Sequence, residues 1–127
     1  MNARLLGLVW LAGIGIGCSD QTAGRLRLEG TVTYKNAPVV FGTIQFDPDP
    51  ARGGSGPQGS ADIADGQYKT SPETGPKPGP HIVRITGYAK KPDSPNVRPL
   101  FTDARVSVDI PVGATTFPIA VPDKPEK

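Results

Sequence analysis

The chain has 127 residues, of which 16 are glycine and 15 are proline, so long helices are disfavoured. Its 14 basic and 12 acidic residues are scattered, and no run of lysine and arginine offers the basic surface that nucleic-acid binding requires. The length suits one domain, and the glycine and proline content leaves two interpretations open, a turn-rich β domain or a disordered chain.

The N-terminus has the features of an export signal. Arg4 supplies a positive charge, and the uncharged stretch from Leu5 to Ile16 is too short for a membrane-spanning helix, which needs about 20 apolar residues. We therefore interpret residues 1–17 as an apolar signal helix that is removed on export. Loss of Arg4 with this segment leaves the remaining charges almost balanced.

The signal ends at Cys18, the only cysteine of the chain. Gly17 and Cys18 resemble the cleavage box of bacterial lipoproteins, although Gly15 stands where this family usually has leucine. The resemblance implies cleavage between Gly17 and Cys18 and a diacylglyceryl group on the cysteine sulfur, with palmitate-like chains in the membrane. Two or three such chains hold a protein durably at a membrane. The alternative, an ordinary buried thiol, fits poorly with this position.

Ser19 follows the cysteine. In well-studied export systems an aspartate at this position retains a lipoprotein in the inner membrane, so Ser19 favours the outer membrane of a bacterial cell envelope. We expect residues 18–25 to form a lipidated tether, residues 26–121 a β-sandwich domain, and residues 122–127 a charged tail.

Apolar and polar residues alternate over residues 25–35 and again over residues 39–47, which predicts two half-buried strands joined by a tight turn. Residues 51–59 are rich in glycine and proline and form a loop. The positions expected to face the core are Leu26, Leu28, Val32, Tyr34, Gly42, Ile44 and Phe46.

Short strands at residues 60–63 and 67–70 flank Asp65-Gly66, a strong hairpin signal. Further strands are predicted at residues 81–88, 105–112 and 116–121, so about seven strands indicate an all-β, antiparallel β-sandwich. The inward positions expected in these last strands are His81, Val83, Ile85, Val106, Val108, Ile110, Val112, Phe117, Ile119 and Val121.

Four segments also follow known motifs. Leu28–Tyr34 holds a Gly-x-Val strand, Thr43–Phe46 ends in phenylalanine, Asp62–Tyr68 approximates Asp-x-x-Gly-x-Tyr, and Pro78–Ile85 approximates Pro-Gly-x-Tyr-x-Val-x-Val with His81 in place of tyrosine. In this order the segments resemble carboxypeptidase-regulatory-like domains. The resemblance implies a transthyretin-like, seven-stranded sandwich with a non-catalytic accessory or surface role.

Residues suited to catalysis are scarce. His81 is the only histidine, and neither a serine elbow nor a free cysteine accompanies it, so we expect a structural role and no enzymatic activity. A zinc site needs three or four nitrogen or sulfur ligands, and no cofactor is expected. A hydrolase therefore has no supporting constellation.

Four carboxylates are weak candidates for calcium. Asp47, Asp49, Asp62 and Asp65 lie near predicted strand ends and turns, where oxygen ligands for calcium often gather. The alternative, which we favour, is that Asp62 and Asp65 stabilise a turn by accepting backbone hydrogen bonds, and that Asp47 and Asp49, each before a proline, lie at a strand exit.

Phe41 and Tyr88 lie opposite the inward faces of their strands, so they are candidates for stacking on a ligand. The chain without its signal has no tryptophan, which counts against a strong lectin. The main expectation is a lipid-anchored, non-catalytic envelope module with a structural or interaction role. Its partners would be the membrane, through acyl chains on Cys18, and an unknown envelope protein or glycan. The alternative is a binding module for envelope glycans or peptides, with the loops at 51–59 and 89–99 as contact regions.

Overall fold

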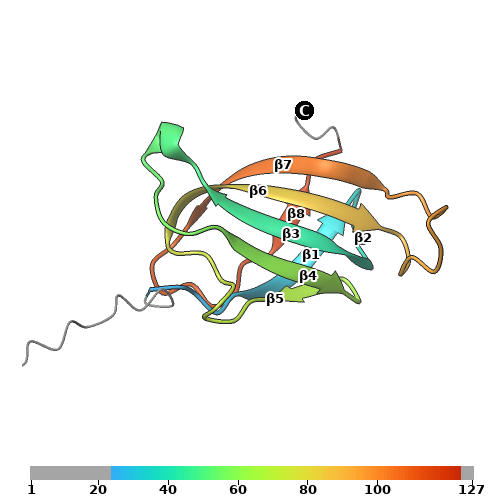
Figure 1. Ribbon diagram of the computed structural model, residues 1–127, viewed down its shortest axis with the longest axis horizontal. Helices are drawn as coiled ribbons and strands as arrows, with labels where there is room; N and C mark the ends of the chain where they lie inside the picture. The colour runs from blue at the N-terminus through green and yellow to red at the C-terminus, as the bar shows by residue number, and fades with distance from the viewer. Residues whose placement is uncertain (1–23, 124–127) are drawn as a thin grey trace, which may run out of the picture.

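The computed structural model describes residues 24–123, within which the chain forms eight β-strands and one short 3-10 helix (Figure 1). The predicted all-β fold is therefore confirmed. In chain order the elements are β1 (Glu29–Tyr34), β2 (Ala37–Pro38), β3 (Phe41–Pro48), η1 (Pro50–Arg52), β4 (Gly59–Ala64), β5 (Gln67–Lys69), β6 (Gly79–Tyr88), β7 (Phe101–Ile110) and β8 (Ile119–Val121).

The strands form one curled sheet in the order β2-β1-β5-β4-β3-β6-β7, and β8 pairs with β1 outside this order. In Figure 1 the front layer contains β5, β4, β3, β6 and β7, and β1 crosses behind it together with β2 and β8. The curl encloses a single hydrophobic core between the two layers, which gives the molecule its β-sandwich character.

The pairing of β8 differs from the antiparallel arrangement that the sequence predicts. β1 and β8 are parallel, with Val32 opposite Ile119. The return path of the chain explains this difference. The segment after β7 leads to the start of β1, where the Glu29 N–H donates to the Thr115 carbonyl at 3.0 Å. From that point β8 runs in the same direction as β1.

The alternating pattern correctly predicts the buried positions of the two central strands. Ile44 and Phe46 of β3 and Val83 and Ile85 of β6 are at most 1% exposed. Because successive residues of a strand point to opposite faces, their neighbours form the outer face of the same sheet. This outer face carries the candidate site.

Both predicted hairpin turns are confirmed. Lys35 and Asn36 have φ angles of 51° and 63°, and Asp65 and Gly66 have φ angles of 54° and 78°. Two consecutive left-handed residues are what a two-residue type I′ hairpin requires. These turns set the register of β2 on β1 and of β5 on β4.

Three strands begin three or four residues away from their predicted first positions, and the other predicted strands differ by at most two residues. The alternation at residues 25–35 and 116–121 extends beyond β1 and β8, which are shorter, whereas β7 begins four residues before the predicted position 105. An irregularity in the pairing of β6 with β7 accompanies this early start, and Asp103 has a left-handed φ of 53° beside it. Such a bulge breaks the alternation that marks a strand in a sequence.

The end of β7 is also earlier than predicted. Pro111 has no N–H to donate and ends the ladder, and Gly113 turns the chain with a φ of 77°. Val112 is consequently 89% exposed, and its predicted position in the core is wrong. Ile110, two residues earlier, is the last buried residue of the strand.

Candidate binding face on the outer side of the sheet

The outer face is organised by four cross-strand pairs between β3 and β6. Phe41 lies opposite Tyr88, Thr43 opposite Thr86, Gln45 opposite Arg84, and Asp47 opposite Ile82. Each pair is two residues from the next, which corresponds to about 7 Å along the strands. Aromatic, hydroxyl and charged side chains therefore follow one another in a single row along the face.

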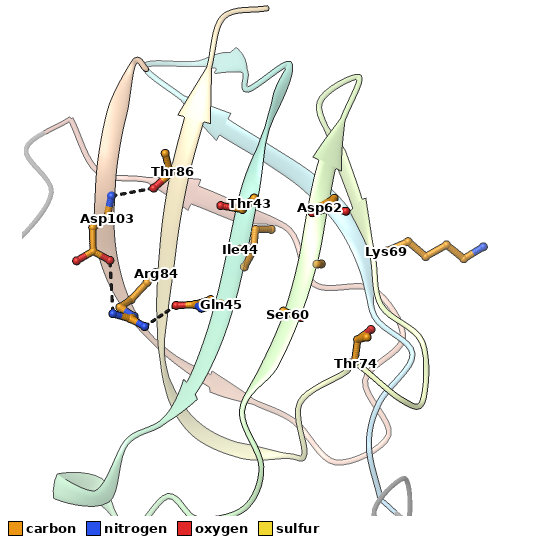
Figure 2. A pocket seen from close by; sticks show the side chains of 11 residues that line it. Thr43, Ile44, Gln45, Ser60, Asp62, Lys69, Thr74, Arg84, Thr86 and Asp103 are labelled. Carbon is orange, nitrogen blue, oxygen red and sulfur yellow. Dashed lines mark hydrogen bonds and ion pairs between the residues drawn. The ribbon is translucent and has the colours of Figure 1, made fainter. Parts of the chain in front are cut away.

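The middle of this face is an open hollow of about 470 Å³. Figure 2 shows it with the side chains that project from β3, β4, β5, β6 and β7. Its lining is polar, apart from parts of Ile44 and Ala61. The polar lining residues are Thr43, Gln45, Ser60, Asp62, Lys69, Thr74, Arg84, Thr86 and Asp103.

Arg84 is the side chain that several neighbours hold in place. Its Nε lies 2.7 Å from Asp47 Oδ2. Its Nη2 donates to Gln45 Oε1, and its Nη1 lies 3.8 Å from Asp103 Oδ1 (Figure 2). About one third of the side chain, 32%, stays exposed. The guanidinium is thus both positioned by protein contacts and accessible to a ligand.

Asp103 reaches this cluster because of the bulge in β7. Its backbone N–H donates to Thr86 Oγ1 at 3.1 Å, and its carboxylate lies between Arg84 and Arg105, 3.5 Å from Arg105 Nη2. The sequence pattern does not predict that these residues lie together. The outward alternation of β6 marks Arg84, but the bulge that brings Asp103 beside it leaves no comparable signal.

The charges in the hollow cancel. Asp62 and Asp103 are its two carboxylates, and Lys69 and Arg84 are its two cations. A face with balanced charges has no long-range preference for strongly acidic or strongly basic ligands. Its hydrogen-bonding groups suit a polar, uncharged ligand.

Phe41 and Tyr88 lie on the outer face, where the alternation places them, and each is half-buried. Their ring centroids are 6.4 Å apart and the rings are inclined by 57°. This inclination prevents one flat platform, so each ring offers its own surface. The pair lies directly beside Thr43 and Thr86, at the margin of the polar hollow.

Asp49, one of the weak calcium candidates, is occupied by other contacts. Its carboxylate accepts from the Ala51 N–H at 3.1 Å and from Arg52 Nε at 2.7 Å, which fixes the start of η1. The hydrogen bond from Arg52 holds the pKa of Asp49 below its ordinary value. Asp49 thus lies directly after the end of β3, where its carboxylate stabilises the first turn of η1.

The other three carboxylates have different surroundings. Asp47 pairs with Arg84, Asp62 lies in the outer hollow, and Asp65 forms the turn between β4 and β5. Within residues 24–123, no three His, Cys, Asp or Glu side chains are grouped to hold a metal ion. The geometry thus gives the calcium hypothesis no support.

His81 faces the core and is 1% exposed. Its Nδ1 lies 2.9 Å from the Gly79 carbonyl oxygen, whereas its Nε2 has no partner among the described residues. The ring therefore fills the inward position that the alternation of β6 predicts.

Comparisons with known proteins identify no family. No family model matches the chain, and no curated protein and no solved structure matches it either. The resemblance to carboxypeptidase-regulatory-like domains accordingly stays a prediction.

The predicted lipidation and cleavage positions, Cys18 and Gly17, lie outside the described residues, as does Gly15. No helix within residues 24–123 has the length and apolar character needed to cross a bilayer. The described segment that precedes β1 lies at the end of the sandwich opposite the loop between β6 and β7 (Figure 1).

Proposed function

We propose that the chain is a lipid-anchored, non-catalytic binding module of the bacterial envelope, and that its outer sheet face takes an uncharged glycan. The observation that carries this proposal is the Phe41–Tyr88 pair on the same face as the polar hollow around Arg84. A half-buried aromatic pair on the outer face of the sheet favours a binding role over a purely structural one.

Carbohydrate chemistry matches both parts of this face. Sugar hydroxyls both donate and accept, so they suit carboxylate, guanidinium and amide groups such as those of Asp103, Arg84 and Gln45. The apolar face of a sugar ring stacks on an aromatic ring such as Tyr88. The Phe41–Tyr88 pair and the Gln45–Arg84 pair are four residues apart along the strands, about 13 Å, which leaves room for more than one sugar unit.

A glycan fits this face better than a peptide does. Extended peptides bind mainly by adding a strand to a sheet edge, where backbone groups are free. The outer face offers side chains only, because β3, β4 and β6 each have a neighbour on both sides. The buried position of His81 adds support for a non-catalytic role.

The transthyretin-like topology is part of the same proposal. The segments that resemble carboxypeptidase-regulatory-like motifs coincide with β1, β3, the β4–β5 hairpin and β6. The lipid anchor rests on Cys18 and the preceding signal, with Ser19 favouring the outer membrane. A tether of residues 18–25 spans at most about 28 Å, so the domain would stay near the membrane surface.

The anchor is tested by mass spectrometry of the N-terminal tryptic peptide, residues 18–25, from the membrane fraction. A diacylglyceryl group on Cys18 is the expected result. A chain that begins at Met1, or a mature N-terminus with a free thiol, would contradict the anchor and leave the glycan proposal standing.

Glycan binding is tested with the full chain, extracted from membranes in detergent, by co-sedimentation with insoluble envelope polysaccharide. Tyr88→Ala and Phe41→Ala should each weaken binding about tenfold, because each removes an aromatic contact. Leu100→Ala is the matched control, since Leu100 is 43% exposed but belongs to the loop beside the face. Equal binding by all three variants would contradict the proposal, as would competition by peptide but not by soluble oligosaccharide.

A further inference from the structure

The strand β7 is the last strand of the sheet and has one free edge. β6 pairs with it on one side, and β8 pairs with β1 rather than with β7. The directions of the backbone N–H and C=O groups in β7 can be worked out from β6. In β6 the carbonyl of Pro80 accepts from the Asp49 N–H, so the backbone of Pro80 points toward β3. The backbone N–H and C=O groups of successive residues point to opposite sides of a strand. The backbone groups of His81 therefore point toward β7, where His81 pairs with Val108.

It follows that Arg105, Ser107 and Asp109 direct their N–H and C=O groups away from β6. Within residues 24–123 these groups have no hydrogen-bond partner. The segment is also limited at both ends, by the left-handed Asp103 and by Pro111. Between them lies a regular, unpaired strand edge of the kind that can accept another strand.

The outward side chains of this edge have a self-complementary order. Arg105 precedes Ser107 by two residues, and Asp109 follows it by two. In an antiparallel pair centred on Ser107, each Arg105 lies opposite the Asp109 of the second copy, and the two Ser107 residues face each other. We propose that β7 pairs with β7 of a second copy in this register, to give a twofold symmetric dimer.

The inner side of β7 supports the same arrangement. Val106 and Val108 face the core but are only half-buried, in contrast to Val83 on β6, which is 0% exposed. In the dimer Val106 lies opposite Val108 of the second copy, so each strand covers apolar surface that the edge leaves accessible. The interface is isologous, because one patch is used by both copies.

Charged residues on an edge strand commonly prevent association. Such protection depends on like charges meeting when two copies approach. Here the register that pairs the free backbone groups of residues 105, 107 and 109 also brings opposite charges together. The charge order therefore selects one register and favours a second copy of this chain as the partner.

Symmetry makes a cysteine at position 107 a direct test. The two Ser107 Cα atoms of a hydrogen-bonded antiparallel pair lie about 5.5 Å apart, which matches the usual spacing of a disulfide. The full chain with Ser107→Cys, oxidised mildly in intact envelopes, should give a crosslinked dimer on a non-reducing gel. Ser60→Cys, exposed on β4, is the matched control, and the parent chain reports any crosslinking through Cys18.

Charge reversal then tests the register. In the Ser107→Cys background, Arg105→Asp or Asp109→Arg should lower the crosslinked fraction about tenfold, because each places two pairs of like charges opposite each other. The two reversals together should restore part of the crosslinking, because opposite charges of the two copies meet again while the Arg105–Asp103 and Asp109–Arg52 ion pairs within each copy are lost. Crosslinking no stronger than that of Ser60→Cys would overturn the dimer, and no recovery in the double reversal would overturn this register.

The dimer and the glycan site are separable. Tyr88→Ala lies outside the β7 edge and should leave Ser107→Cys crosslinking unchanged, whereas Arg105→Asp should leave the sugar-stacking contacts of Tyr88 and Phe41 in place. Failure of either test therefore does not decide the other.

Discussion

At the residue scale, the buried ring of His81 carries an uncompensated polar atom. One ring nitrogen contacts the Gly79 carbonyl, and the other, Nε2, is buried without a partner within the described residues. A buried polar atom without a hydrogen bond costs about 1–3 kcal/mol, more than the roughly 1 kcal/mol that one hydrogen bond contributes. His81 thus lowers the stability of the core it fills.

Replacement of His81 by an apolar residue should stabilise the protein. We expect His81→Leu to raise the free energy of unfolding by about 1 kcal/mol and the midpoint of thermal unfolding by about 4–8 °C. Circular dichroism during heating measures this change. Val83→Ala, at a core position of the same strand, should lower stability by roughly 2–4 kcal/mol and serves as the opposite control. A destabilised His81→Leu protein would show that Nε2 is satisfied in solution.

Tyr68 gives a prediction about alkaline pH. Burial raises the pKa of its phenol well above the ordinary value, and its hydroxyl donates to the Phe117 carbonyl at 2.5 Å. The unfolded chain releases this proton near pH 10 and the folded chain does not, so stability is complete below about pH 10 and falls as the pH rises further.

Absorbance of phenolate during a pH titration measures this behaviour, with Tyr68→Phe as the control. The parent protein should show one phenol that ionises only together with unfolding, and the variant should lack it. Ionisation of every phenol near pH 10 in the folded protein would contradict the buried position of Tyr68.

At the scale of the elements, the β1–β2 hairpin is closed by a costly turn. Lys35 occupies a left-handed conformation that residues other than glycine, asparagine and aspartate rarely adopt. The pair Lys35→Asn and Asn36→Gly creates the preferred sequence of a type I′ turn and should raise stability by about 1 kcal/mol. Chemical denaturation measures this, and an unchanged midpoint would indicate that the hairpin opens independently of the core.

Strand positions were predictable where period-two alternation is unbroken. β3 and β6 follow it throughout, so their buried faces and the outward positions of Phe41 and Tyr88 could be inferred from the sequence. Only the two ends of β7 could not be placed correctly, because the bulge at Asp103 interrupts the alternation and Pro111 ends the strand before Val112. Alternation describes faces, and it contains no information about bulges.

The contacts of the candidate site were less predictable than its strands. Arg84, Asp47 and Asp103 come from β6, β3 and β7, and they meet only because of the order and register of those strands. The parallel direction of β8 was equally hidden, since a strand with one buried face looks the same in either orientation. Partner and direction are properties of the whole sheet.

At the scale of the molecule, β8 is a small element with a large role. Ile119 and Val121 are 3% and 4% exposed, and β8 is the strand that pairs with one side of β1 near Val32. A chain that ends at Pro118 loses both side chains, each worth about 1.5–3 kcal/mol, and also the pairing with β1. This loss is comparable with the whole stability of a typical domain.

We therefore expect the chain truncated after Pro118 to lack a cooperative thermal transition. A chain truncated after Asp123 keeps β8 and should unfold like the parent. Circular dichroism of the two truncated proteins measures this difference. Cooperative unfolding of the shorter chain would show that β1 is stable without its parallel neighbour.

The parallel pair of β1 and β8 has a further consequence for the order in which the protein matures. Among the described strands β1 is synthesised first and β8 last, so the sandwich cannot close until the ribosome has synthesised residues 119–121. Contacts between such distant segments also make folding slow. If the proposed export signal is used, this delay would keep the sandwich open while the chain is still being synthesised, when an extended chain can be transported.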